Sequence, residues 1–114
     1  MTNTSLTNLT ESEVEQYVRL TFKQYKIENF SLFWNKRCKN TLGFANPWKK
    51  RIELNPIILS NFSLFKKVLL HEIAHILQYF RMGETYKVNG RNDFHGKVFK
   101  EVCKEIGISP ETHI

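Results

Sequence analysis

The sequence has few cysteines, prolines and glycines, and it has no long apolar segment. Of its 114 residues, 2 are Cys, 3 are Pro and 5 are Gly. Two cysteines are too few for a disulfide framework or for a zinc ribbon with four Cys ligands. No apolar run has the length of a membrane span, and the N-terminus lacks the basic and apolar segments of a signal peptide. We therefore expect a cytoplasmic protein, in the host cytoplasm if the source is a virus, with no membrane partner.

Length and composition indicate one small globular domain. A chain of 114 residues has room for a single domain, and 41% of these residues are hydrophobic. Nine Phe and two Trp side chains supply enough apolar volume for a core without disulfide bonds. We expect a flexible, polar N-terminus over residues 1–9 and one monomeric domain over residues 10–114.

The positive charge is concentrated in one stretch of the chain. The formal net charge is +6 at pH 7, and residues 36–51 contain six bases and no acid. Such a stretch predicts a surface that attracts nucleic acid, and a solvated lysine-rich face is the alternative interpretation. The candidate nucleic-acid-binding residues are Lys36, Arg37, Lys39, Lys49, Lys50 and Arg51.

The first part of the chain predicts an amphipathic helix. Thr10 and Glu13 have the spacing of a capping box, and Leu9 and Val14 are placed to form a hydrophobic staple around it. Apolar residues then recur at helical spacing to about Lys26. The residues expected on the buried face are Val14, Tyr17, Val18, Thr21, Phe22 and Tyr25.

The middle of the chain predicts three short strands, at residues 30–35, 41–46 and 49–54. These segments are rich in aromatic and β-branched residues and are separated by turn-prone residues. We expect them to form an antiparallel or mixed meander, with mainly antiparallel pairing. Together with the helices, this gives an α+β fold.

The last part predicts two helices, one from about Ser63 to Arg81 and one from Asn92 or Asp93 to Ile106. Each has an apolar stripe at helical spacing. The stripes are Phe65, Val68, Leu69, Ile73, Ile76, Leu77 and Phe80 in the first helix, and His95, Val98, Phe99, Val102, Cys103 and Ile106 in the second.

An H-E-x-x-H motif lies within the first of these two helices. His71 and His75 are four residues apart, so both rings can reach one metal ion from the same helix face. Glu72 lies beside that face, where a general base can take a proton from a zinc-bound water. The alternative is two core histidines with a glutamate between them, which leaves a glutamate unexplained in an apolar helix.

A catalytic zinc needs a third protein ligand. Gln78 and Arg81 occupy the positions where an extended motif has a glycine and a third histidine, so the ligand must come from elsewhere. His95 is the best candidate, because it begins the apolar stripe of the last helix and reaches the metal if that stripe packs on the motif helix. The rival ligands are Glu84, Glu101 and Glu105, and His113 is expected to face solvent.

Four segments of the chain resemble the SprT-like zinc metallopeptidases, the family that includes the eukaryotic protease Spartan. The segments are Leu42-Gly43-Phe44-Ala45, Ile52-Glu53-Leu54-Asn55 with residues 56–59, Leu70-His71-Glu72-Ile73-Ala74-His75, and Phe94-His95-Gly96-Lys97-Val98-Phe99. The H-E-x-x-H motif alone is shared by many zinc peptidases. Its combination with the Leu-Gly strand and the later His-Gly-x-x-Phe is much more specific.

The resemblance implies a zincin-like fold in which the C-terminal helix supplies the third ligand. It implies one catalytic Zn²⁺ held by His71, His75 and His95, with Glu72 as the general base. It further implies cleavage of proteins, including proteins bound or cross-linked to DNA, with DNA as activator. Many members carry a C-terminal zinc ribbon or DNA-binding tail that this sequence does not show, so we expect a stand-alone catalytic core.

For the mechanism, we expect Glu72-assisted attack of zinc-bound water on a peptide bond, without a covalent intermediate. We expect an extended peptide to add to an exposed strand edge at Ile52, Glu53 and Leu54, just before the connector to the motif helix. Tyr79 and Tyr86 are candidates for stabilising the oxyanion.

Three other functions remain open. A zinc-dependent nuclease would use the histidines and the basic stretch, but it would not require Glu72. A nucleic-acid-binding protein without peptidase activity would use zinc as a structural element, with Cys38 or Cys103 as fourth ligand. An inactive decoy would occupy the binding surface of a partner.

Overall fold

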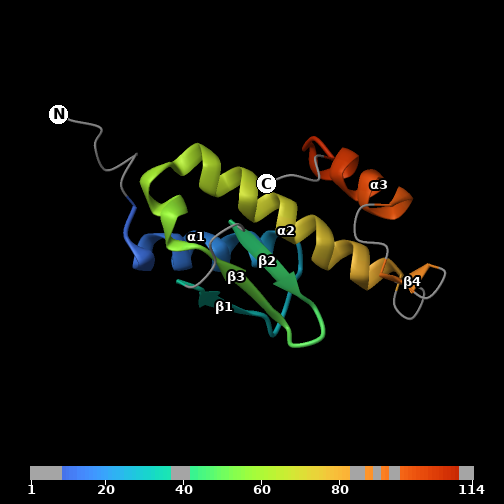
Figure 1. Cartoon of the computed structure of the whole chain (residues 1–114), viewed down its shortest axis with the longest axis horizontal. Coiled ribbons are helices and arrows are strands. Elements are labelled where there is room, and N and C mark those ends of the chain that lie inside the picture. Colours follow the sequence, from blue (N-terminus) through green and yellow to red (C-terminus); the bar gives the residue numbers. More distant parts are fainter. Residues whose placement is uncertain (1–8, 37–41, 83–86, 89–90, 93–95, 111–114) are drawn as a thin grey trace.

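The computed structural model describes residues 9–36, 42–82, 87–88, 91–92 and 96–110. The chain has an α+β fold, as the sequence predicts (Figure 1). Its elements are α1 (Glu11–Gln24), β1 (Ser31–Trp34), β2 (Gly43–Asn46), β3 (Arg51–Leu54), the 3-10 helix η2 (Pro56–Ser60), α2 (Phe62–Met82), β4 (Lys87–Val88), β5 (Arg91–Asn92) and α3 (Lys97–Ile106).

The sheet is mixed, which was one of the two predicted pairings, but the predicted meander order is wrong. The strand order is β1-β3-β2, with the third strand in the centre. β3 pairs in parallel with β1 and antiparallel with β2, and both ladders cover Arg51–Leu54. Ile52 and Leu54 explain the central position of β3, because both side chains are fully buried and need cover from both sides.

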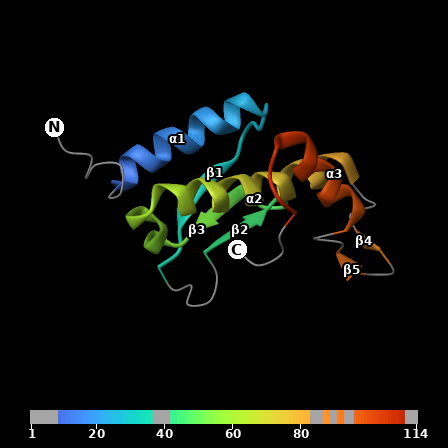
Figure 2. The ribbon, with the colours of Figure 1, turned by 90° about the horizontal axis from the view of Figure 1, so that it is seen from above.

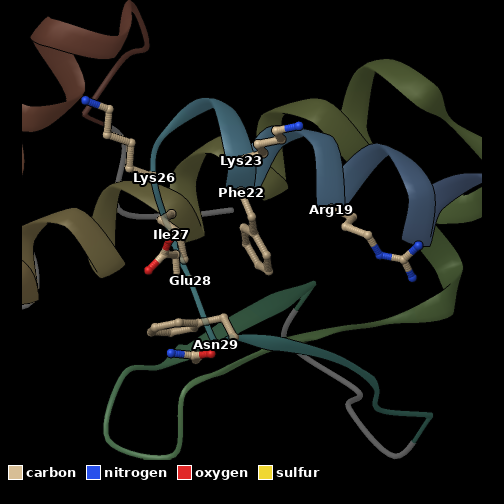
Figure 3. Close-up of a pocket in the computed structure, with 8 residues that line it drawn as sticks. Arg19, Phe22, Lys23, Lys26, Ile27, Glu28 and Asn29 are labelled. Atoms are coloured by element: carbon tan, nitrogen blue, oxygen red, sulfur yellow. The ribbon is translucent and has the colours of Figure 1, made fainter.

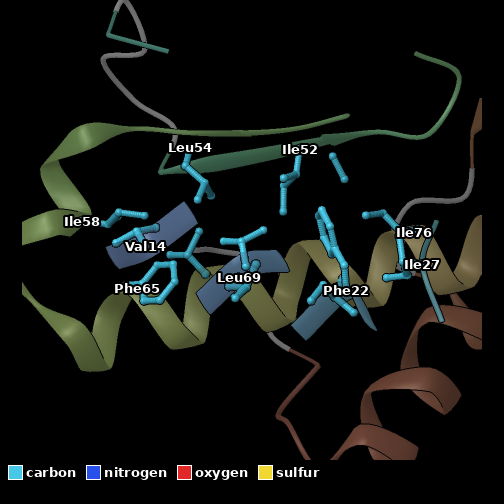
Figure 4. Packing of buried hydrophobic residues seen from close by; sticks show 13 residues of the cluster. Val14, Phe22, Ile27, Ile52, Leu54, Ile58, Phe65, Leu69 and Ile76 are labelled. Atoms are coloured by element: carbon cyan, nitrogen blue, oxygen red, sulfur yellow. The ribbon is translucent and has the colours of Figure 1, made fainter. Parts of the chain in front are cut away.

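α1 and α2 cover the same face of this sheet, which makes the domain a two-layer structure (Figures 1 and 4). The core between the layers joins Val14, Val18 and Phe22 of α1 to the sheet and to α2. α2 contributes more buried side chains to this core than any other element, as its length and apolar stripe predict. These contributing residues are Phe65, Val68, Leu69, Ile73 and Ile76.

The start of α1 confirms the predicted capping box. The Thr10 hydroxyl accepts a hydrogen bond from the backbone N–H of Glu13. The Glu13 carboxylate accepts one from the backbone N–H of Thr10, with a donor–acceptor distance of 3.0 Å. Leu9 packs against the core, and its N–H donates to the carbonyl of Leu59 at 2.8 Å. These bonds satisfy donors that a helix start otherwise leaves without partners.

α3 packs along the outside of α2 (Figure 2). The apolar stripe of α3 contacts α2 through Phe99, Val102 and Cys103, which form a second buried cluster with Ala74. The predicted start near Asn92 or Asp93 is wrong, because Asn92 lies in β5 and α3 begins at Lys97 after Gly96. The helix ends at Gly107, whose φ of 81° is a left-handed conformation that glycine adopts without strain.

Two further features differ from the sequence prediction. Phe80 was expected in the buried stripe of α2, but its side chain is 50% exposed and contacts Phe30 at the surface. No strand was predicted after α2, but Lys87–Val88 and Arg91–Asn92 pair as antiparallel strands.

Within the ranges given above, no helix is both long enough and apolar enough to cross a membrane.

Candidate functional site

α2 brings both histidines of the motif and its glutamate into the interior. His71, Glu72 and His75 are 5%, 5% and 9% exposed. The two imidazole rings lie one helical turn apart, with centroids 4.9 Å from each other and ring planes at 80°. This separation confirms the predicted juxtaposition of the rings on one helix face.

Phe99 of α3 covers both rings. Its side chain stacks on His75, with centroids 4.4 Å apart and planes at 25°, and it meets His71 edge to face at 5.3 Å. Phe99 is fully buried. Since Phe99 is the last residue of the His-Gly-x-x-Phe segment, this contact gives that segment a direct role at the histidine pair.

Glu72 points from α2 towards β2. Burial of its carboxyl group raises the pKa from the ordinary value of 4.5 to about 8, and a hydrogen bond from the backbone of Ala45 opposes part of this rise. The side chain is therefore a desolvated carboxyl group held against the backbone of a strand. That environment is typical of acid–base residues in active sites.

The close contact between α2 and β2 requires a glycine at position 43. A Cβ at Gly43 would lie 2.7 Å from Val68 Cγ1 and 3.4 Å from Glu72 Cγ. The missing side chain lets the strand approach the helix beside Glu72. In the sequence, Gly43 stands out only as part of the Leu-Gly segment that resembles the SprT-like family. Its structural role was not predicted, because that role depends on two segments far apart in the chain.

The predicted third ligand, His95, lies outside the described residues, as does Glu84. α3 does pack on the motif helix, which was the stated condition for His95 to reach the metal. Glu101 and Glu105 are exposed, and Glu105 forms an ion pair with Arg81, so neither faces the histidine pair.

Cys103 is buried against Ala74 and Phe99. In the part of the chain that the structure describes, no three His, Cys, Asp or Glu side chains form a group that could hold a metal ion. Cys103 therefore does not join His71 and His75, which argues against it as a fourth ligand. Cys38 lies outside the described residues.

The predicted substrate edge is wrong. Ile52, Glu53 and Leu54 belong to β3, which has a hydrogen-bonded neighbour on each side and cannot accept another strand there. The candidate oxyanion donor Tyr79 packs edge to face on Trp48 at 5.7 Å. Tyr86 lies outside the described residues.

The predicted basic residues divide into two groups. Lys36, Lys49 and Lys50 are exposed. Arg51 instead forms a 3.1 Å ion pair with Glu53 and lies over the Phe33 ring at 5.1 Å. Arg37 and Lys39 lie outside the described residues.

A surface hollow of about 550 Å³ lies away from the histidine pair, where the end of α1 meets the segment before β1 (Figure 3). Phe22 points into it, while the charged ends of Arg19, Lys23 and Lys26 extend outwards. The hollow contains no histidine or cysteine. It therefore lacks the chemistry of the H-E-x-x-H site.

The fold and the site together define an α+β domain with an H-E-x-x-H helix packed between a sheet and a C-terminal helix. The sequence model of the SprT-like family matches residues 10–114, so the chain belongs to the SprT-like family.

The curated relatives agree with this assignment. The chain is 33% identical over 92 residues to a protein named Protein SprT-like from Streptococcus sanguinis. The aligned region covers 74% of this chain and 59% of the relative. The chain is 32% identical over 93 residues to the protein of the same name from Streptococcus gordonii, with 75% and 59% covered. It is also 39% identical over 74 residues to Protein SprT of Glaesserella parasuis, with 62% and 43% covered. No solved structure matches.

Proposed function

We propose that the chain is a zinc-dependent metallopeptidase that hydrolyses peptide bonds, including bonds in DNA-associated proteins. The main support for this proposal is the buried pair His71 and His75, whose ring centroids are 4.9 Å apart, beside the desolvated carboxyl group of Glu72. Two imidazoles on one helix face with an adjacent carboxyl group are the protein groups that a hydrolytic zinc site uses.

His71, His75 and His95 would hold the zinc. The donor set fits this metal, because imidazole nitrogen is a preferred zinc ligand and both described rings lie together on one face. When bound, zinc supplies Lewis-acid activation of water and of the scissile carbonyl. The chain spans 59% of the length of the relatives from Streptococcus sanguinis and Streptococcus gordonii, so the activity proposed here is that of the domain.

Glu72 is the proposed general base and then general acid. It takes a proton from the attacking water and returns it to the leaving amine. A carboxyl group can do both, because it accepts the proton in its ionised form and donates it in its protonated form.

The edge of β2 that has no neighbouring strand among the described residues is the proposed site for the substrate backbone. The N–H of Asn55 donates to the carbonyl of Leu42 at 3.0 Å, which sets the alternation of the antiparallel ladder with β3. By that alternation, the backbone groups of Gly43 and Ala45 point away from β3. An extended peptide that pairs with this edge would lie beside Glu72.

Nucleic acid is the proposed activator or partner. Lys36, Lys49 and Lys50 support this proposal, because their charges are exposed near the ends of the strands. Arg51 contributes less, since its guanidinium already pairs with Glu53.

The test compares the wild type with Glu72→Gln and with Glu101→Gln, a matched change at an exposed glutamate. Bound zinc is measured in each, and each is incubated with an unstructured protein, with and without single-stranded DNA. We expect about one zinc per chain in all three proteins and cleavage by all except Glu72→Gln. Zinc binding without cleavage by the wild type would favour a nuclease or a structural metal site, and a wild type without zinc would contradict the proposal.

A further inference from the structure

Gln78 is the most deeply buried polar side chain in the described part of the chain. It is 0% exposed, whereas Thr21, His71, Glu72 and His75 keep between 5% and 9%. Glutamine is seldom fully buried, because a desolvated amide without hydrogen bonds destabilises the folded state. Gln78 must therefore be held by specific partners.

The amide of Gln78 lies between a zinc-ligand candidate and a thioether. Its Oε1 is 3.4 Å from Nδ1 of His75, three residues earlier on α2. Its Nε2 donates to Sδ of Met82 at 3.7 Å, on the next helical turn. The sulfur is an acceptor, so this contact orients the amide nitrogen towards Met82 and the amide oxygen towards the imidazole.

This orientation favours a proton on Nδ1 of His75. An amide oxygen can only accept a hydrogen bond, so Nδ1 of His75 must donate. In a neutral ring, the lone pair is then on Nε2. Metal-binding histidines generally donate their second ring nitrogen to a nearby acceptor, which sets both the tautomer and the ring orientation.

We propose that Gln78 is a positioning residue for the metal site, which accepts the Nδ1–H of His75 and thereby directs Nε2 of that ring to Zn²⁺. Phe99 completes the support, because it stacks on the face of the same ring at 4.4 Å. Gln78 holds the edge of the imidazole and Phe99 holds its face. This inference rests on the proposed zinc-dependent function, and it gives a role to the residue at the position where the extended motif has a glycine.

The first measurement needs no metal. ¹⁵N NMR of the full chain in chelator, at a pH at which imidazole is neutral, reports which nitrogen of His75 carries the proton. We expect Nδ1–H in the wild type and loss of this preference in Gln78→Met, which keeps the side-chain length but has only a weakly accepting sulfur in place of the amide oxygen. A wild-type ring protonated at Nε2 would overturn the proposal, because the amide would then have to donate.

The second measurement is the Zn²⁺ dissociation constant, determined by competition with a chromophoric chelator. We expect Gln78→Met to weaken Zn²⁺ binding about 10- to 100-fold, and Gln78→Glu to restore it because a carboxylate accepts the same proton. Phe99→Leu should weaken binding as well, since it keeps an apolar side chain but loses the stacked ring. Ile76→Val, a buried change on α2 that faces the sheet, serves as the matched control and should leave Zn²⁺ binding unchanged.

The two measurements separate this inference from the proposed function. A wild type that binds Zn²⁺ with the same affinity as Gln78→Met would overturn the positioning role alone. A wild type with the Nδ1–H tautomer but without Zn²⁺ binding would overturn the proposed function, and the metal-positioning role with it. Equal losses of affinity in Gln78→Met and Gln78→Glu would also overturn the inference, because burial alone would then explain them.

Discussion

Gly43 and Glu72 are 29 residues apart in sequence, yet a Cβ on Gly43 would lie 3.4 Å from Cγ of Glu72. The absence of a side chain on β2 allows the strand to reach α2 at the residue proposed as the general base. The same strand supplies the backbone hydrogen bond from Ala45 that partly offsets the raised pKa of Glu72. The position of the carboxyl group is therefore set jointly by the helix and the strand.

Gly43→Ala should destabilise the protein and impair the site. The added methyl group would meet Val68 Cγ1 at 2.7 Å, so the Val68 side chain or the strand must shift. Overpacking of this kind costs about 1–3 kcal/mol. We expect a lower free energy of unfolding in denaturant titrations and a loss of peptidase activity larger than the unfolded fraction explains.

Gly107→Ala is the matched control for that substitution. A Cβ at Gly107 meets nothing within 4 Å, but the φ of 81° strains any other residue there, by roughly 1 kcal/mol. This variant should lose stability and keep its activity per folded molecule. Equal effects of the two substitutions on activity would show that Gly43 has no special role at the site.

Removal of the Glu72 carboxyl group should change how the stability of the metal-free protein depends on pH. The pKa of Glu72 is raised from 4.5 to about 8 in the folded chain, so the folded state holds the proton more tightly than the unfolded state. Stability from this group is fully present below pH 4.5 and is lost as the pH rises towards 8. The slope is at most about 1.4 kcal/mol per pH unit.

Denaturant titrations in chelator, across this pH range, measure the effect. We expect the free energy of unfolding of the wild type to fall with rising pH more steeply than that of Glu72→Gln. Glu101→Gln, a change at an exposed carboxylate, should follow the wild type. Parallel curves for the wild type and Glu72→Gln would mean that the carboxyl group is solvated in solution.

Cys103 should react slowly with thiol reagents, whether or not zinc is bound. Burial raises the pKa of its thiol, which lowers the amount of reactive thiolate, and the side chain is 0% exposed. The measurement uses a Cys38→Ser variant, so that only Cys103 can be labelled. We expect slow labelling in the native state, rapid labelling in denaturant, and no acceleration in the folded protein when a chelator removes zinc. Faster labelling of folded, zinc-free protein would support a metal–cysteine bond and weaken the peptidase interpretation.

Replacement of the exposed lysines should weaken binding to single-stranded DNA without unfolding the domain. If Lys36, Lys49 and Lys50 contact phosphates, the variant with all three changed to Gln should bind more weakly. The slope of log affinity against log salt should fall by about 0.7 per lost contact. Arg51→Gln should mainly lower stability, because it breaks the ion pair with Glu53 and the contact with Phe33. An unchanged salt dependence in the triple variant would argue against this surface as a nucleic-acid site.

The sequence by itself determined the features that depend on local spacing. The capping box at Thr10, the helix that carries His71 and His75, and the three short strands all follow from periodicity and turn residues within a few positions of one another. The two histidines share a face because any α-helix places residues four apart on the same side. For this reason the placement of His71 and His75 on one helix face could be predicted without a structure.

Only the tertiary structure decided the features that depend on which segments meet. The strand order put β3 in the centre and removed it as a substrate edge, because strand pairing is set by long-range burial of Ile52 and Leu54. Glu72 acquired its raised pKa from the approach of β2, and His75 acquired its stacking partner from α3. Local sequence specifies which side chains can do chemistry, whereas their desolvation and orientation come from contacts between distant segments, for which local spacing carries no signal.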